Sequence, residues 1–126
     1  MATTWTVGAD AAEPLRLAEF WAAALGYILE PGYDNDANGA SIVDPDDVGP
    51  AISFLRVPEP KTAKNRLHLD IRVAGPARDA AAAERMRTKA AELVTLGAVQ
   101  VREDFYGPEL GHIVMLDPEG NEFCVG

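Results

Sequence analysis

The sequence predicts an α+β fold built from two successive modules, each running strand, helix, then three strands. Short apolar runs with β-branched residues are separated by turns rich in Gly, Pro, Asn and Asp, and two longer stretches show helical spacing. Marker residues also recur at a fixed interval: the distance in sequence from Thr6 to His68 equals that from Pro14 to Pro76. We therefore expect a structural duplication, with ordinary α+β alternation as the alternative.

The first module is expected to open with a strand at residues 4–7 and a turn through residues 8–13. Pro14 suits the first turn of a helix, where its missing N–H costs nothing. An apolar stripe follows at helical spacing, and Gly26 supplies a left-handed stop, so the helix spans residues 14–25. Turn-rich segments then separate three further strands, expected at residues 27–29, 40–43 and 51–57.

A linker is expected at residues 58–64, because the two prolines there cannot donate to a β-ladder. It divides a single domain into modules at about 1–58 and 65–126. The second module is expected to begin with a strand at residues 67–73, followed by a helix that starts near Asp79 and stops at Gly97. The apolar stripe of that helix is Met86, Ala90, Leu93 and Val94, and the later strands are expected at residues 98–102, 112–116 and 121–125.

Composition excludes several classes of function. The chain has 126 residues, 48% of them hydrophobic and 25% charged, which is typical of one globular domain. Its net charge of -9 argues against nucleic acid and anionic membranes as partners, since both need a basic surface. No apolar run reaches the length of a membrane span, and the N-terminal residues lack the pattern of a signal peptide. We therefore expect a cytoplasmic protein.

The strand at residues 67–73 is the principal candidate for function. Its strict alternation places His68, Asp70 and Arg72 on one face and apolar residues on the other. Imidazole is the side chain suited to proton transfer near neutral pH, so His68 is the catalytic candidate, with Glu122 assisting. The alternative is a structural histidine hydrogen-bonded to Asp70 or Arg72.

Residues 102–109 are predicted to form a loop that carries Phe105 and Tyr106, two aromatic residues beside Gly and Pro. Such a loop suits a lid or a stacking wall for a ligand, although it would equally suit a cap on the end of the sheet. His112 is expected at an edge. The single cysteine, Cys124, excludes an internal disulfide and is expected to be a small buried residue rather than a nucleophile.

Four segments resemble the vicinal oxygen chelate superfamily of glyoxalase I, extradiol dioxygenases and bleomycin-resistance proteins. More narrowly they resemble the small bacterial glyoxalase-like domains. The segments are FWAAALGY at residues 20–27, VPEPK at 57–61, NRLHLD at 65–70 and DPEGNEFCV at 117–125. The resemblance implies paired βαβββ modules in a half-open eight-stranded barrel, often dimeric, with a ligand inside the curve.

The metal-dependent members of that superfamily take one ligand from each of four strands. By position these ligands fall on Thr6, Ser53, His68 and Cys124. Only His68 is a usual metal ligand, because hydroxyl groups are poor neutral donors. The ligand set is therefore incomplete: a divalent metal would have His68 as its one strong ligand, and no cofactor is firmly implied.

The resemblance and the incomplete ligand set favour metal-free binding of a small molecule over a complete metalloenzyme. The alternative is a lyase or isomerase of the glyoxalase type, with His68 as proton carrier or sole strong metal ligand. Enzymatic activity is thus left open, and the expected partners are a small-molecule ligand and a second copy of the chain. The residues expected to contact the ligand are Thr6, Ser53, Phe54, His68, Asp70, Phe105, Tyr106 and Cys124.

Overall fold

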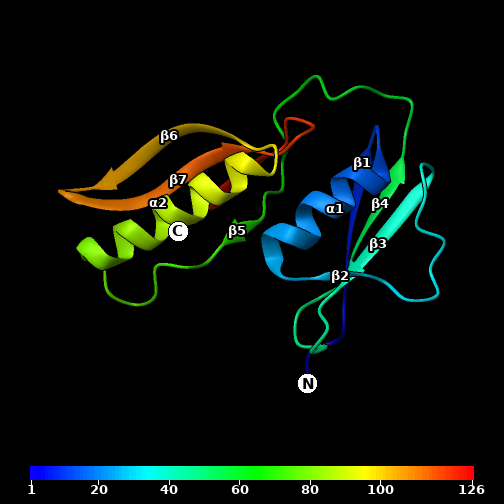
Figure 1. The fold of residues 1–126 in the computed structure, drawn as a ribbon, viewed down its shortest axis with the longest axis horizontal. Coiled ribbons are helices and arrows are strands. Elements are labelled where there is room, and N and C mark those ends of the chain that lie inside the picture. The colour runs from blue at the N-terminus through cyan, green and yellow to red at the C-terminus, as the bar shows by residue number, and fades with distance from the viewer. The chain divides into compact units, whose positions relative to one another are not determined.

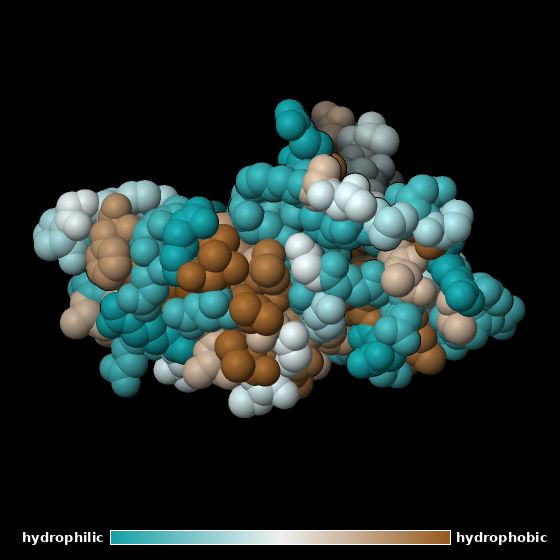
Figure 2. Space-filling view, turned by 90° about the horizontal axis from the view of Figure 1, so that it is seen from above, coloured by the Kyte–Doolittle hydropathy of each residue, from teal (hydrophilic) through white to brown (hydrophobic).

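A computed structural model describes residues 1–126 and divides the chain into two compact units, residues 1–61 and 62–126 (Figure 1). The boundary falls within the segment 58–64 that the prolines mark as a linker. Neither helix combines the length and the apolar character needed to cross a membrane. The surface seen in Figure 2 is mainly hydrophilic, with apolar groups exposed between polar ones.

The first unit is one βαβββ module with a single four-stranded sheet. The sheet has the order β1-β4-β3-β2, in which β1 runs parallel to β4 and the other neighbours are antiparallel. Its elements are β1 (Val7–Ala11), α1 (Pro14–Leu25), β2 (Ile28–Leu29), β3 (Gly39–Val43) and β4 (Ile52–Arg56).

The second unit repeats this topology. Its sheet has the order β5-β8-β7-β6, again with the first strand parallel to the last and the other pairs antiparallel. Its elements are β5 (Asp70–Ile71), α2 (Ala80–Thr95), β6 (Val99–Tyr106), β7 (Glu109–Leu116) and β8 (Glu122–Val125). The predicted fold class, α+β with two βαβββ modules, is confirmed.

The strand registers match the repeat that the sequence predicts. Gly8 lies opposite Ser53 where β1 pairs with β4, and Asp70 lies opposite Cys124 where β5 pairs with β8. The intervals from Gly8 to Asp70 and from Ser53 to Cys124 are those of the predicted duplication. Equivalent positions in the two modules can therefore be compared directly.

Helix α1 has the bounds that the sequence predicts. Pro14 stands at its first turn, and Gly26 ends it in the left-handed conformation with φ of 72°. Its buried face carries Leu17 and Trp21, and the Trp21 ring meets Phe20 edge to face at 5.3 Å between centroids. This face packs against β3 and β4 and forms the core of the first module.

Helix α2 begins one residue after Asp79, whose carboxylate accepts a hydrogen bond from the backbone N–H of Ala82 at 2.9 Å. Met86 and Leu93 are fully buried as predicted, whereas Val94 is 46% exposed and lies outside the stripe. The buried face packs against β7, and the core of the module is completed by Ile113, Met115, Phe123 and Val125.

Two predicted strands were placed wrongly. The first strand is Val7–Ala11 rather than residues 4–7, because its parallel ladder with β4 begins at Val7 and continues through the expected turn. The strand expected at 67–73 pairs with β8 only at Asp70–Ile71. Leu67, one of the residues on the apolar face predicted for this strand, is 87% exposed. Alternation fixed the faces of these segments but not the length of the ladder.

The predicted loop at residues 102–109 is also wrong. Strand β6 continues to Tyr106, and a tight turn with Gly107 at φ of 65° leads directly into β7. Phe105 and Tyr106 therefore stand on a β-hairpin and not on a mobile lid. Irregular pairing between Asp104 and Phe105 marks a β-bulge at this end of the hairpin.

Candidate functional site

The candidate site lies on the sheet of the second module, on the face away from α2. Side chains directly opposite each other on neighbouring strands share a face, so the register places Asp70, Cys124, Val114 and Arg102 in one row across the four strands. His112 and Asp104 form the next row. The opposite face is buried apolar core.

His68 lies just before β5 and contacts the carboxylate of Asp70. Its Nδ1 is 2.8 Å from Oδ1 of Asp70, and the side chains are 44% and 50% exposed. This contact fixes the orientation of the ring and leaves Nε2 directed away from Asp70, where it can meet a ligand. The alternative prediction, a structural histidine hydrogen-bonded to Asp70, is thus correct about the partner, but the ring is partly exposed and not in the core.

Cys124 is half-buried beside this pair. Burial raises the pKa of its thiol, the carboxylates of Asp70, Glu122 and Asp104 raise it further, and Arg102 opposes the change. A thiol in this setting stays protonated near neutral pH and is a weak nucleophile.

Glu122 is held by a lysine and does not reach His68 by any hydrogen bond of its own. Its Oε1 lies 2.7 Å from Nζ of Lys64, and this ion pair is the main cause that lowers the pKa of Glu122. The side chain of Asn65 also binds the backbone N–H and carbonyl of Glu122, at 2.8 and 3.1 Å. Glu122 is therefore a fixed carboxylate at the border of the site.

A second cluster lies on β6 and β7. Nε2 of His112 is 3.0 Å from Oδ2 of Asp104, and Nδ1 of His112 is 2.9 Å from the hydroxyl of Tyr106. Asp104 also accepts from Nε of Arg102 at 3.0 Å. The expectation of an edge position for His112 was wrong, since β7 is an inner strand. His112 carries the only polar side chain in residues 110–116, and this was the available signal that it faces the open side.

Three predicted ligand contacts belong to the first module. Thr6 is exposed and immediately precedes β1, while Ser53 is half-buried with its hydroxyl 3.5 Å from the carbonyl of Val7. Phe54 is only 2% exposed and points to the helix side of its sheet, because it neighbours Ser53 on an alternating strand. Its predicted role in ligand binding is therefore wrong.

The four positions that correspond to the superfamily's metal ligands do not fit a hard divalent ion. Thr6 and Ser53 offer neutral hydroxyls, and the thiol of Cys124 resists deprotonation. A different set exists within the second module, where ligand atoms of His68, Asp70 and Cys124 lie within 4.8 Å of one another. That set would suit a soft ion better than a hard one.

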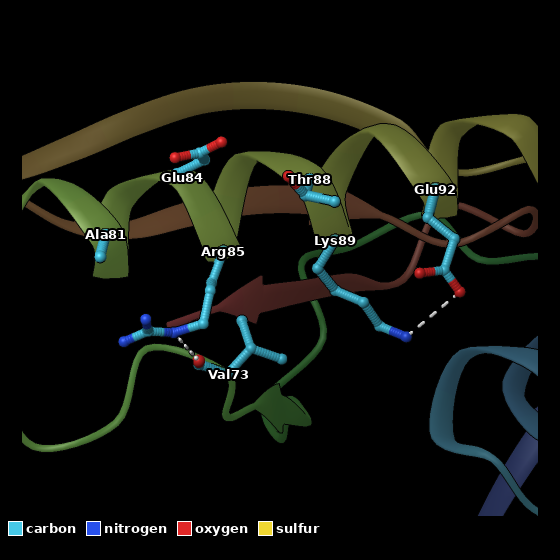
Figure 3. Close-up of a pocket in the computed structure, with 7 residues that line it drawn as sticks. All are labelled: Val73, Ala81, Glu84, Arg85, Thr88, Lys89 and Glu92. Atoms are coloured by element: carbon cyan, nitrogen blue, oxygen red, sulfur yellow. Dashed lines mark hydrogen bonds and ion pairs between the residues drawn. The ribbon is translucent and has the colours of Figure 1, made fainter.

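Two hollows lie elsewhere. One of about 530 Å³ separates α2 from the chain that follows β5 (Figure 3). Across this hollow, Nε of Arg85 donates to the carbonyl of Val73 at 3.1 Å, and Lys89 pairs with Glu92. These two basic side chains of the lining therefore already have partners. The full lining is Val73, Ala81, Glu84, Arg85, Thr88, Lys89 and Glu92. The other, of about 550 Å³, is lined by Ala12, Asn38, Arg56, Val57 and Pro58. Neither lining includes a predicted site residue.

Comparison with known proteins gives a family and a fold. The model of the family described as glyoxalase-like domain matches residues 6–126. A search of the curated proteins found no match.

Solved structures with the same fold include three at low sequence identity. A glyoxalase/bleomycin resistance protein/dioxygenase family enzyme from Burkholderia phytofirmans PsJN has a TM-score of 0.72 at 14% identity, covering 95% of this chain and 94% of that one. A possible glyoxalase from Bacillus cereus has 0.69 at 14%, covering 99% and 98%. The fosfomycin resistance protein FosX from Listeria monocytogenes, complexed with Mn(II), has 0.69 at 10%, covering 99% and 90%.

Proposed function

The chain belongs to the glyoxalase-like domain family, and from this premise we propose that it binds a small cationic molecule at the β5–β8 edge of its second sheet. The binding needs no tightly held divalent metal. The observation that supports this proposal most is the contact between His68 and Asp70, which holds an imidazole and a carboxylate side by side and half-exposed.

Charge favours a cation at this place. The carboxylates of Glu122 and Asp104 are each paired with a basic side chain, Lys64 and Arg102 respectively. Asp70 has only the imidazole of His68 as its partner, and a carboxylate has further lone pairs to accept other donors. The chain also carries a net charge of -9, which attracts cations from solution.

The aromatic residues of β6 belong to a separate part of the face. Strands β5 and β6 are separated by three inter-strand steps, or about 14 Å at the usual spacing. A small molecule at His68 would therefore not touch Phe105 or Tyr106. The expected ligand contacts at this edge reduce to His68, Asp70 and Cys124, with Glu122 at the border.

A matched set of probes tests the proposal. Benzamidine, benzamide and benzoate share one ring and differ in charge, and their binding can be mapped by amide and imidazole chemical shifts. We expect benzamidine to bind about tenfold more tightly than benzamide, with shifts centred on His68 and Asp70. Asp70→Asn should remove the preference, whereas Asp104→Asn, on the same face but at the far edge, should retain it. Equal binding of the two probes would contradict the proposal.

The second candidate is a lyase or isomerase in which His68 carries a proton or holds a metal. The observation that favours it is the orientation of the His68 ring by Asp70, an arrangement common to catalytic and metal-binding histidines. Metal analysis after loading with nickel, zinc, manganese and iron tests the form of this candidate in which His68 holds a metal. We expect no stoichiometric ion to remain after desalting. A retained ion that His68→Ala removes would favour the metalloenzyme.

A further inference from the structure

The cluster on β6 and β7 is not needed for binding at His68, and its geometry points to a different chemistry. We propose that Tyr106, His112 and Asp104 form an acid–base site in which the Tyr106 hydroxyl meets the substrate. The substrate class is a small molecule with an acidic hydroxyl, or a carbonyl group whose neighbouring carbon loses a proton.

The hydrogen bonds define the direction of proton transfer. Nε2 of His112 faces Oδ2 of Asp104 at 3.0 Å, and a carboxylate can only accept, so the neutral ring carries its proton on Nε2. Nδ1 is then the acceptor, and the Tyr106 hydroxyl donates to it across 2.9 Å. A phenol that donates to a carboxylate-oriented imidazole has the arrangement of an activated nucleophile or proton carrier.

The local backbone holds the three groups in place. Asp104 and His112 are direct cross-strand partners. The next pair, Phe105 with Leu110, skips Gly111, so the bulge lies on β7 beside the Tyr106 ring. Arg102 binds both carboxylate oxygens of Asp104 through Nε, at 3.0 and 3.3 Å, which fixes the carboxylate plane. The side chains of His112 and Asp104 are 28% and 33% exposed, so they are sheltered but reachable.

Two glycines make room for the cluster. A Cβ at Gly111 would lie 2.5 Å from the Tyr106 ring, so any larger residue would push the ring aside. A Cβ at Gly126 would lie 3.4 Å from Cβ of His112. Tyr106 is 61% exposed, which leaves its hydroxyl open to a substrate while the ring rests on Gly111. The sequence Gly-His at 111–112 thus provides both the base and the space for the phenol.

The proton-transfer step balances without any further reactant. The substrate gives its proton to the Tyr106 oxygen, and the hydroxyl proton of Tyr106 passes to Nδ1 of His112. The substrate becomes an anion and His112 an imidazolium, whose charge Asp104 stabilises. The reverse transfer returns the proton to the product.

Acetylation by N-acetylimidazole tests the site without the natural substrate. The Tyr106 oxygen attacks the acetyl carbon, the bond to the reagent's imidazole breaks, and the proton leaves through His112 to that imidazole. The folded, full-length protein is acetylated and then digested, and mass spectrometry of the peptides gives the acetylation rates of Tyr106 and of Tyr33. Tyr33 is a 39% exposed tyrosine of the first module. We expect Tyr106 to react about tenfold faster than Tyr33. This is less than the roughly 10²–10⁴-fold that a positioned general base contributes in an enzyme, because the site does not position this reagent.

Variants decide whether His112 is the cause. His112→Asn should reduce the Tyr106 rate about tenfold, and Lys89→Gln, on α2 and outside both sites, should leave it unchanged. If His112→Asn fails to fold, Asp104→Asn and Gly111→Ala provide the same test, each with a severalfold reduction and an unchanged Tyr33 rate. A Tyr106 rate insensitive to these changes would overturn the proposal. Such a failure would leave ligand binding at His68 unaffected, because the reagent does not depend on that site.

Discussion

The two histidines of the chain differ in how many of their ring nitrogens are hydrogen-bonded within the protein. Each contacts a carboxylate, Asp70 for His68 and Asp104 for His112. His68 has its second ring nitrogen directed away from its partner, which suits a ligand. His112 uses both nitrogens inside the protein, so a substrate can reach it only through Tyr106.

The ion pair between Lys64 and Glu122 gives a prediction at the residue scale. Lys64→Gln should raise the pKa of Glu122 toward its ordinary value, since the lysine is the main cause of the lowered pKa. The pKa can be followed by the chemical shift of the Glu122 carboxyl carbon as pH is varied. Lys89→Gln, which removes a lysine paired with Glu92 on α2, is the control and should leave Glu122 unchanged.

The sign of the associated pH dependence follows from linkage. Because the pKa of Glu122 is lower in the folded protein than in the unfolded chain, the pair stabilises the fold above the unfolded pKa. That contribution is lost as pH falls through the folded pKa. The free energy of unfolding, measured in urea, should therefore fall more steeply on acidification for the parent than for Lys64→Gln. Parallel pH profiles for the two proteins would contradict this account.

At the scale of elements, the helices begin by different means. Helix α2 has Asp79 at its N-cap, and the carboxylate accepts the Ala82 N–H. Helix α1 has Glu13 at the same position and forms no side-chain cap bond, and Pro14 directly follows it. The first helix thus relies on proline and burial, and the second on its cap.

Removal of the cap should therefore have a measurable cost in the second module only. Asp79→Ala is expected to lower the free energy of unfolding by about 1 kcal/mol, the usual cost of losing an N-cap. Glu13→Ala should change it by less than about 0.5 kcal/mol. Chemical denaturation of both variants checks the difference. An unchanged free energy of unfolding in Asp79→Ala would show that the Asp79 bond does not stabilise α2.

On the scale of the whole molecule, the two modules share a topology but not a chemistry. The pair Gly8 and Ser53 in the first sheet occupies the positions of Asp70 and Cys124 in the second. The first module therefore carries small residues where the second carries a carboxylate and a thiol. The candidate groups for ligand binding and for proton transfer are concentrated in the second half of the duplicated chain.

Net charge supplies a prediction at this scale. A chain with a charge of -9 should attract benzamidine through its overall field as well as through Asp70, and dissolved salt screens that field. Raising sodium chloride from about 0.01 to about 0.15 M shortens the Debye length from about 30 to about 8 Å and should weaken benzamidine binding severalfold. Binding of neutral benzamide, measured in the same titrations, should hardly change. A cation affinity independent of salt would exclude a contribution of the field.

The sequence by itself determined the two βαβββ modules, the bounds of α1 and the buried stripe around Met86 and Leu93. These features depend on local periodicity and on single residues such as Pro14 and Gly26, whose effects act within a few positions of the chain. The repeat intervals likewise predicted which positions of the two modules are equivalent, and the strand registers agree with them.

Only the tertiary structure decided how long each ladder is and which side chains meet. Pairing partners set the start of β1, the two-residue length of β5 and the continuation of β6 through Tyr106. Phe54 was assigned to the ligand together with its neighbour Ser53, although neighbouring residues on a strand face opposite sides. The sequence did not show which of the two sides was core. The contact among Tyr106, His112 and Asp104 joins two strands through a bulge and two glycines. Such a contact depends on register across strands, which no local pattern contains.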